Sequence, residues 1–433
     1  MVIFIKTVQV ILALSVLIII HEFGHFLWAR AFGIRVEKFY LFFDVGGKAL
    51  VRWHWGGTEF GIGWLPFGGY CKIAGMVDES MDLKQLEREP QPWEFRTHPA
   101  WQRLLVMAGG VINNFIFAIL AFIAIMGIWG DSYIPNQGNR IYVDELAYDL
   151  GFRTGDQILR FDDYEPENFG MLQADLIRRN VTKATVLRGT DTLDIYIDQA
   201  RIGEVLSDPL LFDLAIPFVV DSVAADGLNA ASGLRRGDRI VAFDGQEVEY
   251  LQDSRALLAT LSSREVAASV VRESDTLGLP VRVDSTGRIG VYMRPPEVTT
   301  RHYNLLEAIP AGWREAGRSI GGYLDDLSLL ARPSTGAYKS VGSFIAIGQV
   351  FPETWDWYRF LYILALLSIM LGVMNLLPIP GLDGGHILFT LYEIVTGRKP
   401  GDKFLAVAQT IGMILILALM FLAFGNDISR IIH

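Results

Sequence analysis

The 433-residue chain has one cysteine, Cys71, so no disulfide can form within it and cysteine usage does not indicate a compartment. It also has no excess of basic residues, because 38 lysines and arginines stand against 48 aspartates and glutamates. Nucleic-acid binding needs a clustered basic surface, so no nucleic-acid partner is expected. No small-residue cleavage site follows the first apolar run, which therefore predicts a retained membrane helix rather than a signal peptide.

Apolar residues are abundant: 51% of the chain is hydrophobic, although 20% is charged. This mixture favours a few membrane-spanning helices combined with soluble domains over an ordinary soluble protein. A spanning helix needs about 20 apolar residues. Four segments are candidates to lie in the lipid bilayer: residues 2–32, 104–129, 361–382 and 404–425.

The first segment carries the motif HEFGH directly after an uncharged run. On a helix, H-E-x-x-H places His21 and His25 on one face, where both can bind one metal ion. Glu22 would lie beside that ion and could take a proton from a bound water. Zinc (Zn2+) is the expected cofactor, since catalytic zinc favours imidazole and carboxylate ligands. The alternative is that these groups only satisfy other polar groups in the bundle, although ionisable residues inside a span usually mark a functional site.

The orientation follows from lysines and arginines, which are concentrated between the first and second segments and between the third and fourth. Both loops are therefore predicted to be cytoplasmic, and residues 130–360 to lie on the opposite side. HEFGH and Asp383 then both lie toward the cytoplasmic ends of their helices. This topology permits Asp383 as the third zinc ligand, and His386, three residues further on, is its competitor.

Residues 150–163 (LGFRTGDQILRFDD) and 232–245 (SGLRRGDRIVAFDG) repeat one pattern. Each copy is a Gly-Asp turn followed by a short alternating strand. The pattern resembles the core of PDZ domains, which bind peptide ends by adding a strand to a sheet edge. We therefore expect two tandem PDZ-like domains that bind peptide ends, or alternatively two β-domains that only restrict access.

HEFGH, the sequence NLLPIPGLDGG in the third segment and the repeats between them together resemble the site-2 protease family, and most closely its bacterial RseP type. The resemblance implies that His21, His25 and Asp383 bind zinc and that Glu22 is the general base. It also implies that Asn375 holds the substrate or its tetrahedral intermediate.

Residues 39–75 are rich in aromatics and glycine, a composition typical of short strands and turns. In the family a comparable stretch is a re-entrant β-hairpin whose edge pairs with the substrate. We therefore expect residues 61–75 to supply such an edge, with Gly61, Gly63, Gly68 and Gly69 as substrate-binding candidates. The alternative is a cytoplasmic β-subdomain that only packs.

The predicted fold is a multi-pass α-helical membrane protein with four transmembrane helices, a membrane-associated β-hairpin region and two PDZ-like α+β domains. Residues 1–130 would form the first transmembrane pair with the H-E-x-x-H motif and the β loop. The remaining predicted parts are PDZ-like domains at 131–208 and 209–297, a linker with amphipathic helices at 298–360, and the second transmembrane pair at 361–433.

The predicted function is that of a zinc metalloendopeptidase in the bacterial inner membrane. Its substrates would be the transmembrane segments of single-span membrane proteins already trimmed outside, such as anti-sigma factors or remnant signal peptides. One alternative is a catalytically silent membrane PDZ scaffold, against which the intact Glu22 argues. Another is a metal-handling membrane protein, which would need more intramembrane ligands than this one cluster.

Overall fold

The computed structural model describes residues 1–66, 68–76, 89–332 and 342–432. Phe67 of the predicted substrate-pairing segment, residues 77–88 of the first loop and residues 333–341 of the predicted linker lie outside the described residues. The chain forms two compact units, which are described separately below. The first unit comprises Met1–Gly130, His302–Ala331 and Tyr338–His433, and the second Asp131–Arg301 and Arg332–Ala337.

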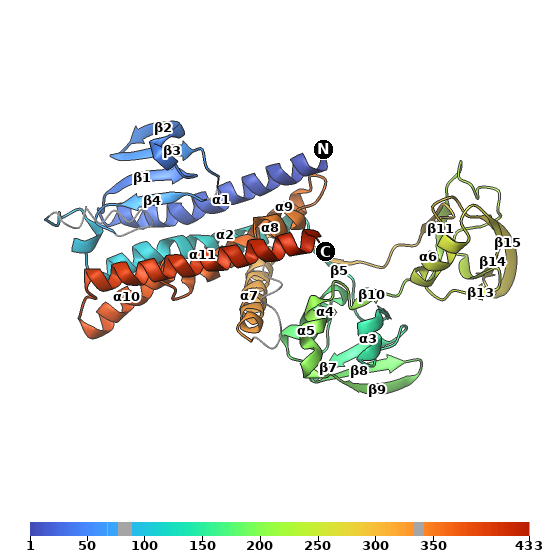
Figure 1. Cartoon of the computed structure of the whole chain (residues 1–433). Helices are drawn as coiled ribbons and strands as arrows, with labels where there is room; N and C mark the ends of the chain where they lie inside the picture. The colour runs from blue at the N-terminus through green and yellow to red at the C-terminus, as the bar shows by residue number, and fades with distance from the viewer. Residues whose placement is uncertain (67, 77–88, 333–341, 433) are drawn as a thin grey trace. The chain divides into compact units, whose positions relative to one another are not determined.

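Among the described residues, four helices of the first unit are long and apolar enough to cross a membrane, as the sequence predicts. They are α1 (Val2–Ala31), α2 (Ala100–Ile128), α9 (Trp357–Leu376) and α11 (Asp402–Ile432) (Figure 1). The third ends six residues before the predicted boundary at 382. Pro378 and Pro380 follow at once, and proline has no amide hydrogen to continue a helix.

Helices α1 and α2 pack closely because glycines face each other at their contact. A side chain on Gly24 would overlap the backbone of Gly109, and one on Gly109 would meet the backbone of Gly24. Small residues at such a contact let two membrane helices approach each other. Helix α9 also packs on α2, and the hydroxyl of Ser368 in α9 donates to the carbonyl of Asn114 in α2 at 2.9 Å. Helix α2 is therefore the common neighbour of α1 and α9.

The chain between α1 and α2 forms a mixed sheet of four strands in the order β2-β3-β1-β4. The strands are β1 (Val36–Leu41), β2 (Ala49–Trp55), β3 (Thr58–Gly63) and β4 (Tyr70–Ile73). Strands β2 and β3 form a hairpin, but β3 then pairs in parallel with β1, and β4 pairs with the other side of β1. The sheet is therefore larger than the predicted β-hairpin.

The sheet has one polar and one apolar face. Lys38 lies opposite Glu59, and Tyr40 opposite Tyr70, which places these polar side chains together. The opposite, apolar face of the sheet carries Phe39 and Phe60, whose ring centroids lie 5.6 and 5.7 Å from that of Phe26 in α1. The apolar face thus holds the sheet against α1, and strand β4 contacts this helix as well.

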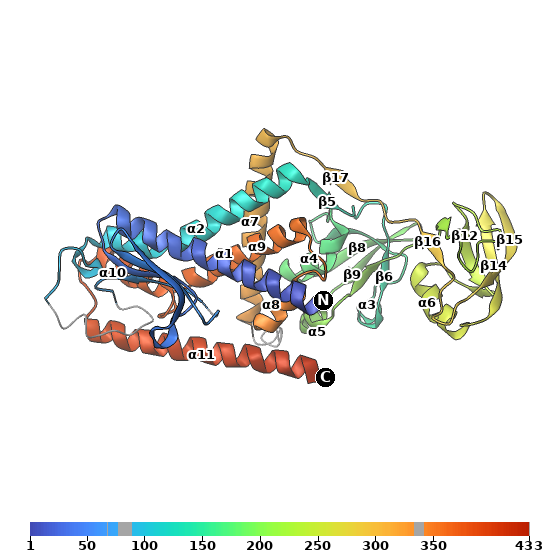
Figure 2. The ribbon, with the colours of Figure 1, turned by 90° about the horizontal axis from the view of Figure 1, so that it is seen from above.

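Beside the four spans, the described residues of the first unit form three further α-helices. Helix α10 (Asp383–Thr396) packs on α2 and α9. Helix α7 (Leu305–Leu330) runs across the direction of α1 and α2 (Figures 1 and 2) and packs on α2 through small residues, including Ala308 and Gly312. The predicted linker therefore contains one long helix, α7, followed by the short α8 (Phe344–Val350).

The second unit contains two copies of one arrangement of strands. Three strands form the sheet of the first repeat: β7 (Gln157–Phe161), β8 (Lys183–Arg188) and β9 (Asp191–Tyr196). The sheet of the second contains β12 (Arg239–Phe243), β13 (Gln246–Glu247), β14 (Glu265–Arg272) and β15 (Asp275–Arg282). The helices α4 (Leu172–Arg178) and α6 (Leu251–Thr260) occupy matching places in the chain order.

Strand pairing sets the limits of the repeats. In the first repeat, β10 (Phe212–Leu214) pairs with β6 (Ile141–Val143). This repeat therefore extends beyond the predicted boundary at 208. The second closes when β16 (Val291–Met293) pairs with β11 (Val220–Val223). Strand β17 (Thr299–Arg301) then pairs with β5 (Asp131–Tyr133), so the start of the predicted linker belongs to this unit.

The Gly-Asp turn of each repeat makes the same ion pair. The Arg188 guanidinium donates to both carboxylate oxygens of Asp156, and Arg272 does the same to Asp238. Each arginine also donates to a glycine carbonyl, that of Gly151 for Arg188 and that of Gly233 for Arg272. The glycines and aspartates of the two copies, which are 82 residues apart, therefore have matching structural roles, and the repeated sequence forms a repeated structure.

Candidate metal centre

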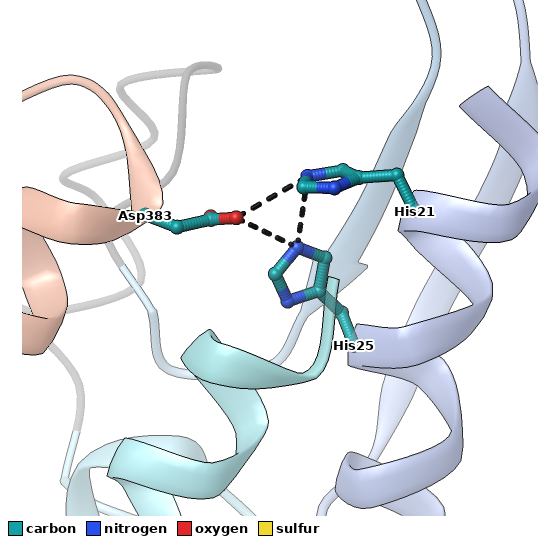
Figure 3. A group of neighbouring side chains, drawn as sticks. All are labelled: His21, His25 and Asp383. Carbon is teal, nitrogen blue, oxygen red and sulfur yellow. Dashed lines mark hydrogen bonds and ion pairs between the residues drawn. The ribbon is translucent and has the colours of Figure 1, made fainter. Parts of the chain in front are cut away.

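Three buried or half-buried side chains converge from two helices of the first unit. His21 and His25 lie one turn apart on α1, and Asp383 is the first residue of α10 (Figure 3). A carboxylate is favourable at this position, because the amino end of a helix carries partial positive charge. Among the described residues these three are the group of histidine, cysteine and acidic side chains whose ligand atoms lie within 4.8 Å of one another.

The three ligand atoms form a nearly equilateral triangle. The Nε2 atoms of His21 and His25 lie 3.2 and 3.3 Å from Oδ2 of Asp383, and 3.3 Å from each other. Tetrahedral zinc with bonds of roughly 2.0–2.1 Å requires its ligands to lie about 3.3 Å apart. The triangle therefore has the size of one face of a zinc coordination tetrahedron.

The hydrogen bonds behind the histidines orient their lone pairs toward this triangle. Nδ1 of His25 lies 2.9 Å from the carbonyl oxygen of Val106. A carbonyl only accepts, so Nδ1 carries a proton; in a neutral ring, Nε2 then presents its lone pair toward Asp383. Oδ2 of Asp383 is itself buried, with no hydrogen-bond donor among the described residues. A cation between these electron-rich atoms would satisfy all of them.

His21 is oriented by Asn114, a fully buried residue of α2. The Asn114 amide lies 3.1 Å from Nδ1 of His21, while its Oδ1 has no partner among the described residues. Amide nitrogen and oxygen are assigned from the hydrogen-bond network. If Oδ1 instead faces Nδ1, it accepts the ring proton, and the lone pair of His21 also points into the triangle.

Gly110 of α2 provides the space for both imidazoles. A Cβ atom at this position would lie 2.5 Å from Nε2 of His25 and 2.6 Å from Cε1 of His21. Any side chain here would displace at least one ligand. The sequence signal for this residue is the pair Gly109-Gly110 in an otherwise apolar span, but its meaning depends on how closely α1 and α2 approach.

A cavity of about 740 Å³ opens at the metal centre. Its lining includes His21, Glu22, His25 and Asp383, together with residues from β1, β4, α9 and α11. Glu22 accepts a hydrogen bond from the backbone of Cys71 in β4. Asn375, at the end of α9, also lines the cavity, and its Nδ2 lies 3.4 Å from Nε2 of His21.

His386 also lines the cavity but does not belong to the group of ligand atoms. It lies three residues after Asp383 on α10, and the structure brings the aspartate, not the histidine, between His21 and His25. The geometry therefore favours the expected ligand over its competitor.

The four candidate substrate-binding glycines fall into two groups. Gly61 and Gly63 lie on β3, which is paired on one side with β1 and on the other with β2. The expectation that they lie on an open edge is wrong, because the parallel pairing of β1 and β3 places β3 inside the sheet. Gly68 and Gly69 immediately precede the edge strand β4 and line the cavity.

Gly69 lies where the sheet approaches α1 most tightly. A Cβ atom there would be 2.5 Å from the Ile18 side chain and 2.6 Å from the Tyr40 carbonyl oxygen. Beside it, the Tyr70 hydroxyl donates to Asp44 at 2.7 Å, and the Lys38 ammonium lies 3.0 Å from the same carboxylate. Burial and this hydrogen bond raise the pKa of Tyr70. The polar face of the sheet thus forms one wall of the cavity.

A buried His-His-Asp donor set among four spanning helices, with a glutamate in the same cavity, defines a membrane-embedded zinc hydrolase. Comparison with known proteins agrees: the family model of peptidase family M50 matches residues 9–419. The chain belongs to this family of site-2 proteases and is an intramembrane zinc metalloprotease of the inner membrane, acting on membrane proteins.

Curated relatives match along almost their whole length. The protease RseP of Yersinia pestis is 32% identical over 97% of this chain and 98% of the relative. The regulator of sigma-E protease RseP of Salmonella typhimurium (strain 14028s / SGSC 2262) is 31% identical, with the same coverage. A protein of Vibrio cholerae serotype O1 (strain ATCC 39315 / El Tor Inaba N16961) that its name provisionally describes as a zinc metalloprotease is 29% identical, again over 97% and 98%.

Proposed function

We propose that His21, His25 and Asp383 hold the zinc ion and that Glu22 is the general base of peptide-bond hydrolysis. The triangle of ligand atoms is the observation that carries this proposal. When bound there, zinc supplies a Lewis acid that polarises the scissile carbonyl and acidifies a water molecule. Glu22 takes the proton of the attacking water and then delivers it to the leaving amine.

Asn375 is the proposed donor to the scissile carbonyl oxygen. Its amide group lies in the cavity next to His21. Negative charge develops on that oxygen as the water attacks, and a donor fixed beforehand stabilises this charge most effectively. Replacing Asn375 should therefore lower kcat more than it raises KM.

Strand β4 is the proposed binding edge for the substrate backbone, with Gly68 and Gly69 at its start. A transmembrane helix buries its carbonyl groups in its own hydrogen bonds, so it must unwind locally before cleavage. Unpaired backbone groups at membrane depth are costly, and an edge strand can pair with them. The hydrogen bond from the Cys71 backbone to Glu22 supports this, since it places β4 directly beside the general base.

The proposed substrates are single-span membrane proteins that another protease has already trimmed outside. The loops rich in lysine and arginine support a cytoplasmic position for the β-sheet and a periplasmic one for the two repeats. The repeats act as PDZ-like domains that exclude untrimmed substrates or bind their new ends. Because one relative is named a regulator of sigma-E protease, membrane-bound anti-sigma factors are the first substrates to test.

The test compares the wild type with Glu22→Gln on a pre-trimmed single-span substrate in membrane vesicles. The variant should keep its zinc and lose cleavage, whereas His21→Ala and Asp383→Ala should lose zinc as well. Glu37→Gln is the matched control, because Glu37 lies on β1 and pairs with Lys72 but does not line the cavity. Equal cleavage by wild type and Glu22→Gln would contradict the proposed base.

A further inference from the structure

Helix α2 is the common support of the metal centre. The carbonyl of Val106 orients His25, and the Asn114 side chain orients His21. Both histidines belong to α1, which α2 holds through the contact of Gly24 with Gly109. Two of the three ligands are thus positioned by α2, and the third, Asp383, arrives on a different helix.

Helix α10 is not a continuation of α9, so its position is not fixed by that span. The chain between them, residues 377–382, is not helical. At the amino end of α10, Gly384 lies against the carbonyl groups of Leu376 and Leu377. This contact limits the approach of α10 but leaves its far end to be held by something else.

An ion pair holds that far end against α2. Arg103, in the first turn of α2, donates through Nη2 to Oε1 of Glu393, which lies ten residues after Asp383. The Nε atom of Arg103 donates to the carbonyl of His98 at 3.0 Å, which fixes the guanidinium. Arg103 is only 7% exposed. Charges as buried as this one are rarely found without a partner.

We propose that the Arg103–Glu393 ion pair is a positioning device that sets Asp383 at coordinating distance from the two histidines. At 1.5 Å per residue, Glu393 lies about 15 Å along the helix axis from Asp383. A tilt of α10 at its far end therefore displaces the carboxylate at its amino end. Through the ion pair, the position of the third ligand depends on α2, the helix that also orients the other two ligands. This inference rests on the zinc site proposed above.

The test measures zinc affinity by chelator competition on the purified full-length protein. Glu393→Gln should bind zinc about 10- to 100-fold more weakly, the range typical of lost partners behind metal ligands. Arg103→Lys is a second variant, used in case Glu393→Gln does not fold, because it keeps the buried positive charge. It should also weaken zinc binding. The matched control is Arg318→Gln, which removes an exposed ion pair with Glu315 on α7 and should leave the affinity unchanged.

A double-mutant cycle separates positioning from general stability. In an Asp383→Asn background, Glu393→Gln should have little further effect, because the ligand through which it acts is already altered. Cobalt bound in place of zinc gives a second measurement, since its visible spectrum changes when a ligand is displaced. Unchanged affinity and spectrum in Glu393→Gln and Arg103→Lys, or fully additive losses in the cycle, would overturn the inference. Full zinc affinity in Asp383→Asn alone would instead contradict the proposed zinc site.

Discussion

Nδ1 of His25 lies 2.9 Å from the carbonyl oxygen of Val106, so a ligand on one spanning helix is oriented by the backbone of the next. Asn114, two turns further along α2, has the same relation to His21. The packing of α1 against α2 therefore orients both histidines independently of Asp383. We therefore expect residues of α2 that lie outside any ligand motif to affect zinc binding.

Replacing Asn114 with alanine should weaken zinc binding about 10- to 100-fold, because His21 loses the partner that fixes its ring. Zinc affinity and cleavage should fall together, and chelator competition measures the first. Asn113→Ala is the control on the neighbouring residue, whose side chain donates to the Ile20 carbonyl at 3.3 Å and touches no ligand. Equal losses in both variants would assign Asn114 to helix packing instead.

Gly110→Ala should remove zinc even though the substitution adds a single methyl group. The new Cβ atom would lie 2.5 Å from Nε2 of His25 and 2.6 Å from Cε1 of His21, well inside van der Waals contact. Widening a packed helix contact to relieve such an overlap typically costs about 1–3 kcal/mol. Metal content of the purified protein checks this. Gly127→Ala lies on the same helix, where the added Cβ would be an ordinary 3.6 Å from Ala308, and should retain zinc. Normal zinc content in Gly110→Ala would show that α1 and α2 can separate freely.

The close approach of the three proposed ligands could be predicted from the sequence because its signals are local. The spacing of HEFGH places two histidines on one helix face, and the charge of the loops places Asp383 at the same depth. The end of α9 at Leu376 also has a local cause, the two prolines that follow. Position along the helix alone could not separate Asp383 from His386, which lies three residues further on. The resemblance of NLLPIPGLDGG to the family's motif favoured Asp383.

The role of the β-sheet residues could not be predicted in full, because it depends on strand order. Gly61 and Gly63 lie in a segment whose composition is typical of short strands and turns, which led to the expectation of an open edge. The parallel pairing of β1 with β3 instead places them on an interior strand of the sheet. Gly110 was missed for a related reason: its importance comes from the approach of α1, which no spacing along α2 encodes. Both cases are set by contacts between segments distant in sequence.

Acid should destabilise the second repeat through Asp238. The hydrogen bond from the Arg272 guanidinium holds the pKa of this carboxyl below its usual value. A lowered pKa in the folded state stabilises the protein above the unfolded pKa of about 3.9, and this stability is lost as pH falls through the folded pKa. The protection of the amides of residues 239–272 from hydrogen exchange, relative to the intrinsic exchange rate at each pH, should therefore fall below about pH 4. Asp238→Asn should exchange faster at neutral pH and change less on acidification, and an identical pH profile in both would contradict the assignment.

Cys71 allows a direct test of strand pairing, because it lies on β4 beside Glu22 and is the only cysteine of the chain. In the Glu22→Gln variant, a substrate with one cysteine moved stepwise along its transmembrane segment should form a disulfide with Cys71 under mild oxidation. A paired strand turns alternate side chains to one face, so the yield should vary with a period of two residues near the cleavage site. Cys71→Ser should abolish the product. A period near 3.6 would show that the substrate remains helical at β4, and the proposed binding edge would then be wrong.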